Sequence, residues 1–284
     1  MLSSNFRLEP RPVRIGGYQT RLLERSGPAD LTLLFIHGWA DSADTYRPLM
    51  AALADVPARL VAVDLPQFGA AEDLAPGPQL PQFVAFVRAA LAHFGARGRL
   101  LPIAQSLGGR ALLMALNQPL SLDIPGCVVI GPAPLDLPAW QKMLVRNGSL
   151  APSASRLGDE LSWEQQQAEF LKSFKRTCLA QPELVADSVY ADYLSHYTPA
   201  RIARHMSSLI SIGNELQQPL QLSALQLPVE MIWGELDRMA PLKGADRYVE
   251  ALAQVNLTVF KGCGHHAHLE RVAETAGIVR RLIP

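Results

Sequence analysis

Two hydrophobic patterns alternate along the chain. Residues 31–36 and 127–130 form almost unbroken apolar runs of strand length, which are typical of strands buried on both faces of a sheet. Residues 80–94 instead place apolar side chains at helical spacing. Strands that alternate with helices predict a mostly parallel sheet covered by helices on both faces. The expected elements are a hairpin across Gly16-Gly17, strands at 31–36, 60–63, 100–103, 127–130, 229–233 and 257–260, and helices at 44–53, 80–94, 107–116, 241–253 and 267–282.

Strand patterns are missing between residues 135 and 225, where helical patterns replace them. Ser162-Trp163-Glu164-Gln165 has the form of a capping box, and Thr198-Pro199 is an N-cap residue followed by a first-turn proline. We therefore expect a helical cap at 135–225, inserted into a core domain formed by 1–134 and 226–284. The apolar positions of its helices are Phe170, Leu171, Phe174, Ile202, Met206 and Leu209. Either some of these side chains line an acyl pocket, or all of them pack onto the core domain.

Composition narrows the class of protein. The chain has 284 residues, of which 49% are apolar and 18% charged, so it can bury a large core. Lys plus Arg total 26 and Asp plus Glu total 26, a balance that argues against a nucleic-acid partner. Three cysteines do not suggest a disulfide framework, and no apolar run reaches membrane-spanning length. We expect a cytoplasmic protein without a membrane span, and its oligomeric state stays open.

One junction between a predicted strand and a predicted helix carries chemistry. It has the sequence Ile103-Ala104-Gln105-Ser106-Leu107-Gly108-Gly109, with small residues two positions before and two after Ser106. Small residues there permit a turn sharp enough to lift a serine clear of the sheet. The amides at the start of the helix would favour a developing negative charge. The alternative is a glycine-rich turn with a purely structural role.

Two further residues complete a possible catalytic triad. Asp237 follows the predicted strand at 229–233, and His265 follows the one at 257–260. Active residues of α/β sheets gather at the carboxyl ends of parallel strands, so Ser106, Asp237 and His265 should meet there as nucleophile, acid and base. Glu235 is an alternative acid, since it flanks the same strand end.

These segments together resemble the α/β-hydrolase superfamily over almost the whole chain outside the cap. The resemblance rests on His37-Gly38-Trp39, the loop at 64–69, the serine turn, the segment at 233–238 and Gly262-Cys263-Gly264-His265. It implies the α/β-hydrolase fold, with an eight-stranded sheet and the cap after the sixth strand. It also implies an oxyanion hole made by the amides of Trp39 and Leu107. Ala104 and Gln67 stand where the family commonly has glycine, a departure that bears on the subfamily more than on catalysis.

The resemblance also implies a reaction. Its motifs are most similar to the pimeloyl-carrier-protein methyl esterase group, so we expect a carboxylesterase or thioesterase that acts through an acyl-serine on a small-molecule or carrier-bound substrate. A serine nucleophile excludes the dehalogenases and epoxide hydrolases, which use aspartate. Two alternatives stay open, a C–C bond hydrolase or lyase and a non-hydrolytic ligand-binding protein. Lys172, Lys175 and Arg176 form a basic face that either meets an acidic carrier protein or is merely solvated.

Candidate substrate contacts are Trp39, Phe170, Phe174 and Arg110. Arg110 is similar to an arginine of the menaquinone-pathway synthase branch, where the substrate bears a carboxylate, and its alternative is a helix-surface position. His265, His266 and His268 form a cluster of a kind that can bind metal. The other histidines are scattered without carboxylates at ligand spacing, so we expect no metal and no cofactor. His266 and His268 are then packing or rim residues.

Overall fold

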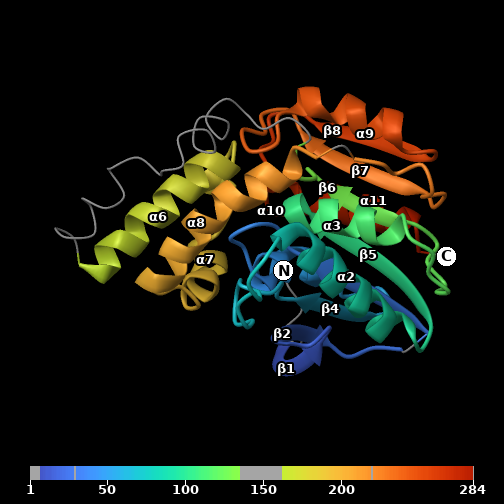
Figure 1. The fold of residues 1–284 in the computed structure, drawn as a ribbon, viewed down its shortest axis with the longest axis horizontal. Helices are drawn as coiled ribbons and strands as arrows, with labels where there is room; N and C mark the ends of the chain where they lie inside the picture. Colours follow the sequence, from blue (N-terminus) through green and yellow to red (C-terminus); the bar gives the residue numbers. More distant parts are fainter. Residues whose placement is uncertain (1–6, 29, 135–161, 219, 284) are drawn as a thin grey trace.

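An eight-stranded sheet forms the centre of the molecule in the computed structural model, which describes residues 7–28, 30–134, 162–218 and 220–283 (Figure 1). The strand order is β1-β2-β4-β3-β5-β6-β7-β8. Strands β1 and β2 form the antiparallel hairpin, β2 pairs antiparallel with β4, and all other pairs are parallel. The strands span Glu9–Ile15, Tyr18–Arg25, Leu31–Ile36, Arg59–Val63, Arg99–Gln105, Cys127–Ile130, Val229–Gly234 and Val255–Phe260 for β1 to β8.

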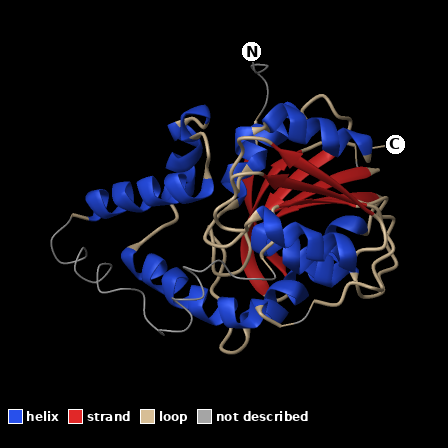
Figure 2. Cartoon of the chain, turned by 90° about the horizontal axis from the view of Figure 1, so that it is seen from above, coloured by secondary structure: helices blue, strands red, loops and turns tan. Residues whose placement is uncertain are grey.

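Helices cover both faces of this sheet (Figure 2). Along β3 every side chain is buried, and successive residues enter opposite cores, since Leu34 packs with one apolar cluster and Phe35 with the other. Helices α2 (Gln79–Gly95), α3 (Ser106–Leu116) and α9 (Ala245–Ala251) supply one core. Helices α1 (Arg47–Ala52), α10 (Ala267–Glu270) and α11 (Val272–Arg281) supply the other. The predicted fold class is therefore confirmed.

Some helix boundaries differ from the prediction. The helix expected at 44–53 begins as a 3₁₀ turn, η1 (Ala43–Tyr46), and the one expected at 241–253 begins as η3 (Leu242–Gly244). The helix expected at 267–282 is broken at Arg271, whose φ of −132° and ψ of 53° are not helical. The Arg271 guanidinium donates hydrogen bonds to the carbonyls of Glu270 and Lys261, at 3.0 and 3.2 Å. These side-chain hydrogen bonds accompany the break in the helical pattern at this residue.

Helices replace strands between β6 and β7, as predicted. These inserted helices are α6 (Trp163–Cys178), η2 (Pro182–Leu184), α7 (Asp187–Leu194) and α8 (Pro199–Leu216), and they project to one side of the sheet (Figures 1 and 2). The capping box at Ser162 and the cap at Thr198 both form. Predicted cap residues 135–161 lie outside the described residues. In the part of the chain that is described, no helix has the length and apolar character needed to cross a bilayer.

Close contact between α3 and the end of β3 depends on Gly108. A Cβ atom at this position would lie 2.3 Å from the carbonyl oxygen of His37, a backbone atom that cannot move aside alone. We expect Gly108→Ala to lower the free energy of unfolding by about 1–3 kcal/mol, since overpacking displaces the strand end. Gly277→Ala is the matched control, because Gly277 also lies in a helix but has no heavy atom within 4 Å of the added carbon. It should stabilise by about 0.5–1 kcal/mol. Urea unfolding measures both, and equal effects would contradict the packing argument.

Candidate active site

Ser106 lies at the junction where β5 ends and α3 begins. Its φ of +52° is in the left-handed region, which lifts the side chain out of the line of the strand. Gly38 approaches from the end of β3, and a Cβ atom there would lie 2.7 Å from the Cβ of Ser106. Only glycine therefore permits the loop after β3 to lie against the serine. The following residue, Leu107, lies in the first turn of α3, whose amides have no partner inside the helix.

His265 and Asp237 form a buried hydrogen-bonded pair on neighbouring loops. The Nδ1 atom of His265 lies 2.7 Å from Oδ2 of Asp237, and the two residues are 4% and 5% exposed. The other carboxylate oxygen of Asp237 accepts hydrogen bonds from the amides of Met239 and Ala240, at 2.8 and 2.7 Å. With both oxygens occupied, the carboxylate is fixed in orientation and the imidazole carries its proton on Nδ1. Nε2 is then free to accept a proton.

Glu270 holds the loop that carries His265. Its Oε1 accepts hydrogen bonds from the amides of Ala180 and Gln181, at 2.8 and 2.6 Å, and its Oε2 accepts from Gly264 at 2.7 Å. The amide of His265 donates to the carbonyl of Cys178 at 2.7 Å. The end of α6 and the histidine loop are thus fixed to each other through one buried carboxylate.

The loop after β3 is organised by a neutral histidine. Nδ1 of His37 donates to the carbonyl of Gly38 at 2.8 Å, and Nε2 accepts from the amide of Leu65 at 2.8 Å. Complete burial lowers the pKa of His37 to about 4, so the ring stays neutral and can make both bonds. Trp39 follows, and its indole Nε1 donates to Oγ of Ser208 in α8 at 3.2 Å. The loop is therefore fixed both to the sheet and to the inserted helices.

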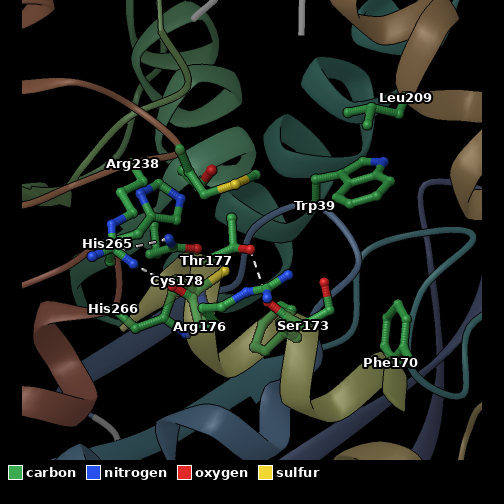
Figure 3. Close-up of a pocket in the computed structure, with 14 residues that line it drawn as sticks. Trp39, Phe170, Ser173, Arg176, Thr177, Cys178, Leu209, Arg238, His265 and His266 are labelled. Atoms are coloured by element: carbon green, nitrogen blue, oxygen red, sulfur yellow. Dashed lines mark hydrogen bonds between the residues drawn. The ribbon is translucent and has the colours of Figure 1, made fainter. Parts of the chain in front are cut away.

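A cavity of about 520 Å³ opens above Ser106 (Figure 3). Both Ser106 and His265 line it, together with the predicted contacts Trp39, Phe170 and Phe174. Trp39 and Ser106 also line a second cavity of about 40 Å³, which Leu107 borders. The remaining lining of the large cavity comes from Gln105, Ser173, Arg176, Thr177, Cys178, Leu209, Arg238, Met239 and His266.

Apolar residues of the predicted cap divide between several surroundings. Phe170, Phe174 and Leu209 line the large cavity, while Leu171 lines an outer groove beside it. Ile202 packs at the edge of an apolar cluster formed by the inserted helices. The side chain of Met206 lies outside the described part of the structure.

Arg110 is not among the residues that line the large cavity, and it is not a surface residue. It is 1% exposed and lies beside Tyr248 of α9, and its Nη2 donates to the carbonyl of Gln218 at 3.3 Å. A role as a direct substrate contact therefore has no support from its position. Helical spacing alone could not show this, because the face that carries Arg110 is covered by α9 and the chain after α8.

Glu235 and Cys263 are poor candidates for catalytic roles. Glu235 is exposed and accepts a hydrogen bond from the amide of Gly262 at 3.0 Å, so it does not orient His265. Burial raises the pKa of the Cys263 thiol to about 12, which keeps it protonated and poorly nucleophilic.

The roles of Glu270 and of the two arginines at the cavity mouth were not predicted, although Arg176 belongs to the basic face identified in the sequence. Arg176 and Arg238 are exposed, line both the large cavity and the outer groove, and are linked by a hydrogen bond from Arg238 Nη1 to the Arg176 carbonyl at 2.7 Å (Figure 3). No local pattern identifies these residues, since their partners come from distant parts of the chain.

Several known proteins are similar to this chain in sequence or in fold. A family profile described as "alpha/beta hydrolase fold" matches residues 32–272. Monoacylglycerol lipase ABHD6 of Bos taurus is 22% identical over 281 residues, which are 96% of this chain and 81% of the relative. Among solved structures, Cfl2 from Burkholderia cenocepacia superposes with a TM-score of 0.77 at 20% identity, covering 99% of this chain and 98% of that one. A 2-hydroxy-6-oxo-6-phenylhexa-2,4-dienoate hydrolase from Rhodococcus sp. strain RHA1 gives 0.75 at 19%, covering 97% and 99%.

Glu270 supplies a direct test of how the histidine loop is held. Glu270→Gln puts an NH₂ group where an acceptor is needed, so at least one of its three amide donors loses its bond. We expect unfolding free energy to fall by about 1–3 kcal/mol, the usual cost of an unsatisfied buried group. Glu274→Gln, at an exposed position on α11, should change it by less than about 0.5 kcal/mol. Chemical denaturation gives both values, and a neutral Glu270→Gln would show that the carboxylate is not needed.

Proposed function

The chain belongs to the alpha/beta hydrolase fold family, and we propose that it is a serine hydrolase that cleaves a carboxylic ester or thioester. One observation carries the proposal. Ser106, in a left-handed backbone conformation, and His265, hydrogen-bonded to Asp237, line the same cavity. A nucleophile, a base and an orienting acid are the parts that acyl transfer through an acyl-serine requires.

In the proposed mechanism, Nε2 of His265 takes the proton of Ser106 as Oγ attacks the carbonyl carbon of the ester. Asp237 stabilises the resulting imidazolium. The amides of Trp39 and Leu107 donate hydrogen bonds to the negatively charged tetrahedral oxygen, with each donor worth about 3 kcal/mol. His265 then protonates the leaving alcohol or thiol and activates a water molecule that hydrolyses the acyl-serine. No step needs a cofactor.

Two features of the cavity and the name of one relative favour an apolar acyl group. Phe170, Phe174 and Leu209 supply apolar walls, and the volume of about 520 Å³ suits a small-molecule substrate. The bovine relative is named as a monoacylglycerol lipase.

The basic face of α6 is partly neutralised within the chain, since Lys172 pairs with Glu169 and Lys175 with Asp187. A small acyl ester is therefore a better candidate than an acyl group on an acidic carrier protein. The cytoplasmic location stays a prediction.

A second candidate rests on the arginines at the cavity mouth. Arg176 and Arg238 offer positive charge to a substrate carboxylate, which C–C bond hydrolysis of a keto acid would require. The Rhodococcus neighbour is named for such a substrate. Assays with nitrophenyl esters and with vinylogous keto acids separate these two reactions. A protein that turns over neither and takes no covalent label would be a ligand-binding protein instead.

Ser106→Ala should abolish turnover of short-chain nitrophenyl esters and labelling by a fluorophosphonate. The expected loss in kcat is on the order of 10⁴-fold or more, as for other triads. Ser223→Ala, at an exposed serine outside the cavity, should label like the wild type. An alanine variant that keeps its label and its activity would exclude Ser106 as the nucleophile.

Phe170→Ala should shift acyl-chain preference toward longer or bulkier esters. The change enlarges the cavity, and each methylene that a pocket accepts or rejects is worth about 1–3 kcal/mol. Leu171→Ala is the matched control, since Leu171 neighbours Phe170 in sequence but lines the outer groove. The ratio of kcat/KM for butyrate and decanoate esters reports the preference. Identical ratios in both stable variants would show that this wall does not select the chain.

A further inference from the structure

A second group of titratable side chains lies behind the catalytic histidine. Asp41 comes from the loop after β3, and His266 and His268 come from the start of α10. The three are 1%, 2% and 0% exposed. Each offers a ligand atom, and these atoms all lie within 4.8 Å of one another. Three buried residues from two loops thus converge on one small volume.

Several nitrogens in this volume have no hydrogen-bond partner. They are Nδ1 of His266 and both ring nitrogens of His268. A neutral imidazole always carries one N–H donor and one acceptor, so His268 leaves both unsatisfied. Such groups cost about 1–3 kcal/mol each and are rare in folded proteins unless a water or an ion binds them.

Stacking fixes these rings without using their polar edges. Tyr46 stacks on His268 with centroids 4.7 Å apart, and His268 stacks on His266 at 5.2 Å. Stacking contacts use the ring faces, whereas the nitrogens lie at the edges. The two imidazoles are therefore held in place with their lone pairs available to a further group.

Asp41 has acceptor capacity left for a cation. Burial raises the pKa of its carboxyl to about 8, because a carboxylate in this volume has no contact with water. Its oxygens accept only from the Ser42 amide at 2.7 Å and the Thr45 hydroxyl at 3.0 Å among the bonds described, and each oxygen has a further lone pair. Burial also lowers the pKa of His268 to about 3, so its ring is neutral and can act as a ligand.

We propose that Asp41, His266 and His268 bind one transition-metal ion, with Zn²⁺ the best fit to two imidazoles and a carboxylate. Zinc takes such ligands at about 2.0–2.2 Å, so side-chain shifts of about 1 Å bring the three atoms to a common ion. The ion would displace the carboxyl proton of Asp41 and leave the fourth position to a water. This site differs from the expectation of no metal, which rested on the lack of carboxylates at ligand spacing from the histidines; Asp41 is brought to them only by the fold.

The ion would tie two functional loops together. His266 directly follows the catalytic histidine, and Asp41 directly follows Ala40, whose carbonyl accepts hydrogen bonds from the hydroxyls of Tyr193 and Tyr197 at 2.5 and 2.7 Å. The site thus lies between the histidine loop and the loop that supports α7. Its role is structural, and the triad chemistry does not pass through it.

The test is zinc binding to full-length protein stripped with EDTA. Added ZnCl₂ should raise Tm by several degrees at concentrations about 100 times Kd. Elemental analysis after dialysis should find one zinc per chain. Asp41→Asn and His268→Phe, which preserve size and stacking, should abolish this zinc-dependent shift. His205→Phe is the matched control, since His205 is 2% exposed and also has an unpartnered Nδ1 but no such cluster. It should keep the full shift.

Two results of the zinc titration would overturn the proposal. One is a wild-type protein that retains no zinc and shows no shift, in which case water fills the site. The other is a shift retained in both Asp41→Asn and His268→Phe. Because either variant can unfold, the spectrum of cobalt-loaded wild type provides a second measurement. It should show ligand-field bands without a thiolate charge-transfer band, and a thiolate band would assign the metal to Cys178 or Cys263 instead.

Discussion

A left-handed backbone at Ser106 is the constraint on which the site depends. Such a conformation costs a non-glycine residue about 1–3 kcal/mol, so its surroundings must maintain it. β5 is hydrogen-bonded between β3 and β6 in the middle of the sheet, and α3 is almost completely buried against it. With both ends of the turn fixed, the serine cannot relax without disrupting the core. The loops after β7 and β8 carry Asp237 and His265, which therefore lie at the same carboxyl-terminal end of the sheet.

Buried polar groups, rather than apolar packing, hold the loops at this edge. Asp64 accepts hydrogen bonds from Arg21 and from the amides of Ala43 and Ala70, at 2.8, 2.8 and 2.9 Å. His37 joins the loop after β3 to the loop after β4. These bonds are directional, so they determine where each loop lies more narrowly than contact between apolar surfaces would. The proposed oxyanion hole needs the amides of Trp39 and Leu107 to be positioned this narrowly.

The sequence predicts the elements whose patterns are local. Buried parallel strands are short apolar runs. Each member of the proposed triad follows one of the strands β5, β7 and β8, and the carboxyl ends of parallel strands lie at one end of a sheet, so the sequence predicts that the three meet. The environment of Arg110 could not be predicted in this way, because the carbonyl that accepts from its guanidinium belongs to Gln218, far along the chain. Glu270 and Asp41 are similar, since each is an isolated acidic residue until the fold brings its partners. Interruption of the last helix at Arg271 likewise depends on a carbonyl from another segment.

Contacts of Glu270 also bear on the order in which the protein matures during synthesis. The amides of Ala180 and Gln181 and the carbonyl of Cys178 find their partners only in residues 264–270. The ribosome therefore releases the end of α6 long before the segment that satisfies it, while most strands of the sheet are already available to pair. The end of α6 therefore lacks these hydrogen bonds until residues 264–270 have emerged. A shorter nascent chain would carry Ser106 and much of the sheet but not His265, so under the proposed mechanism hydrolysis begins only after the histidine loop has been made.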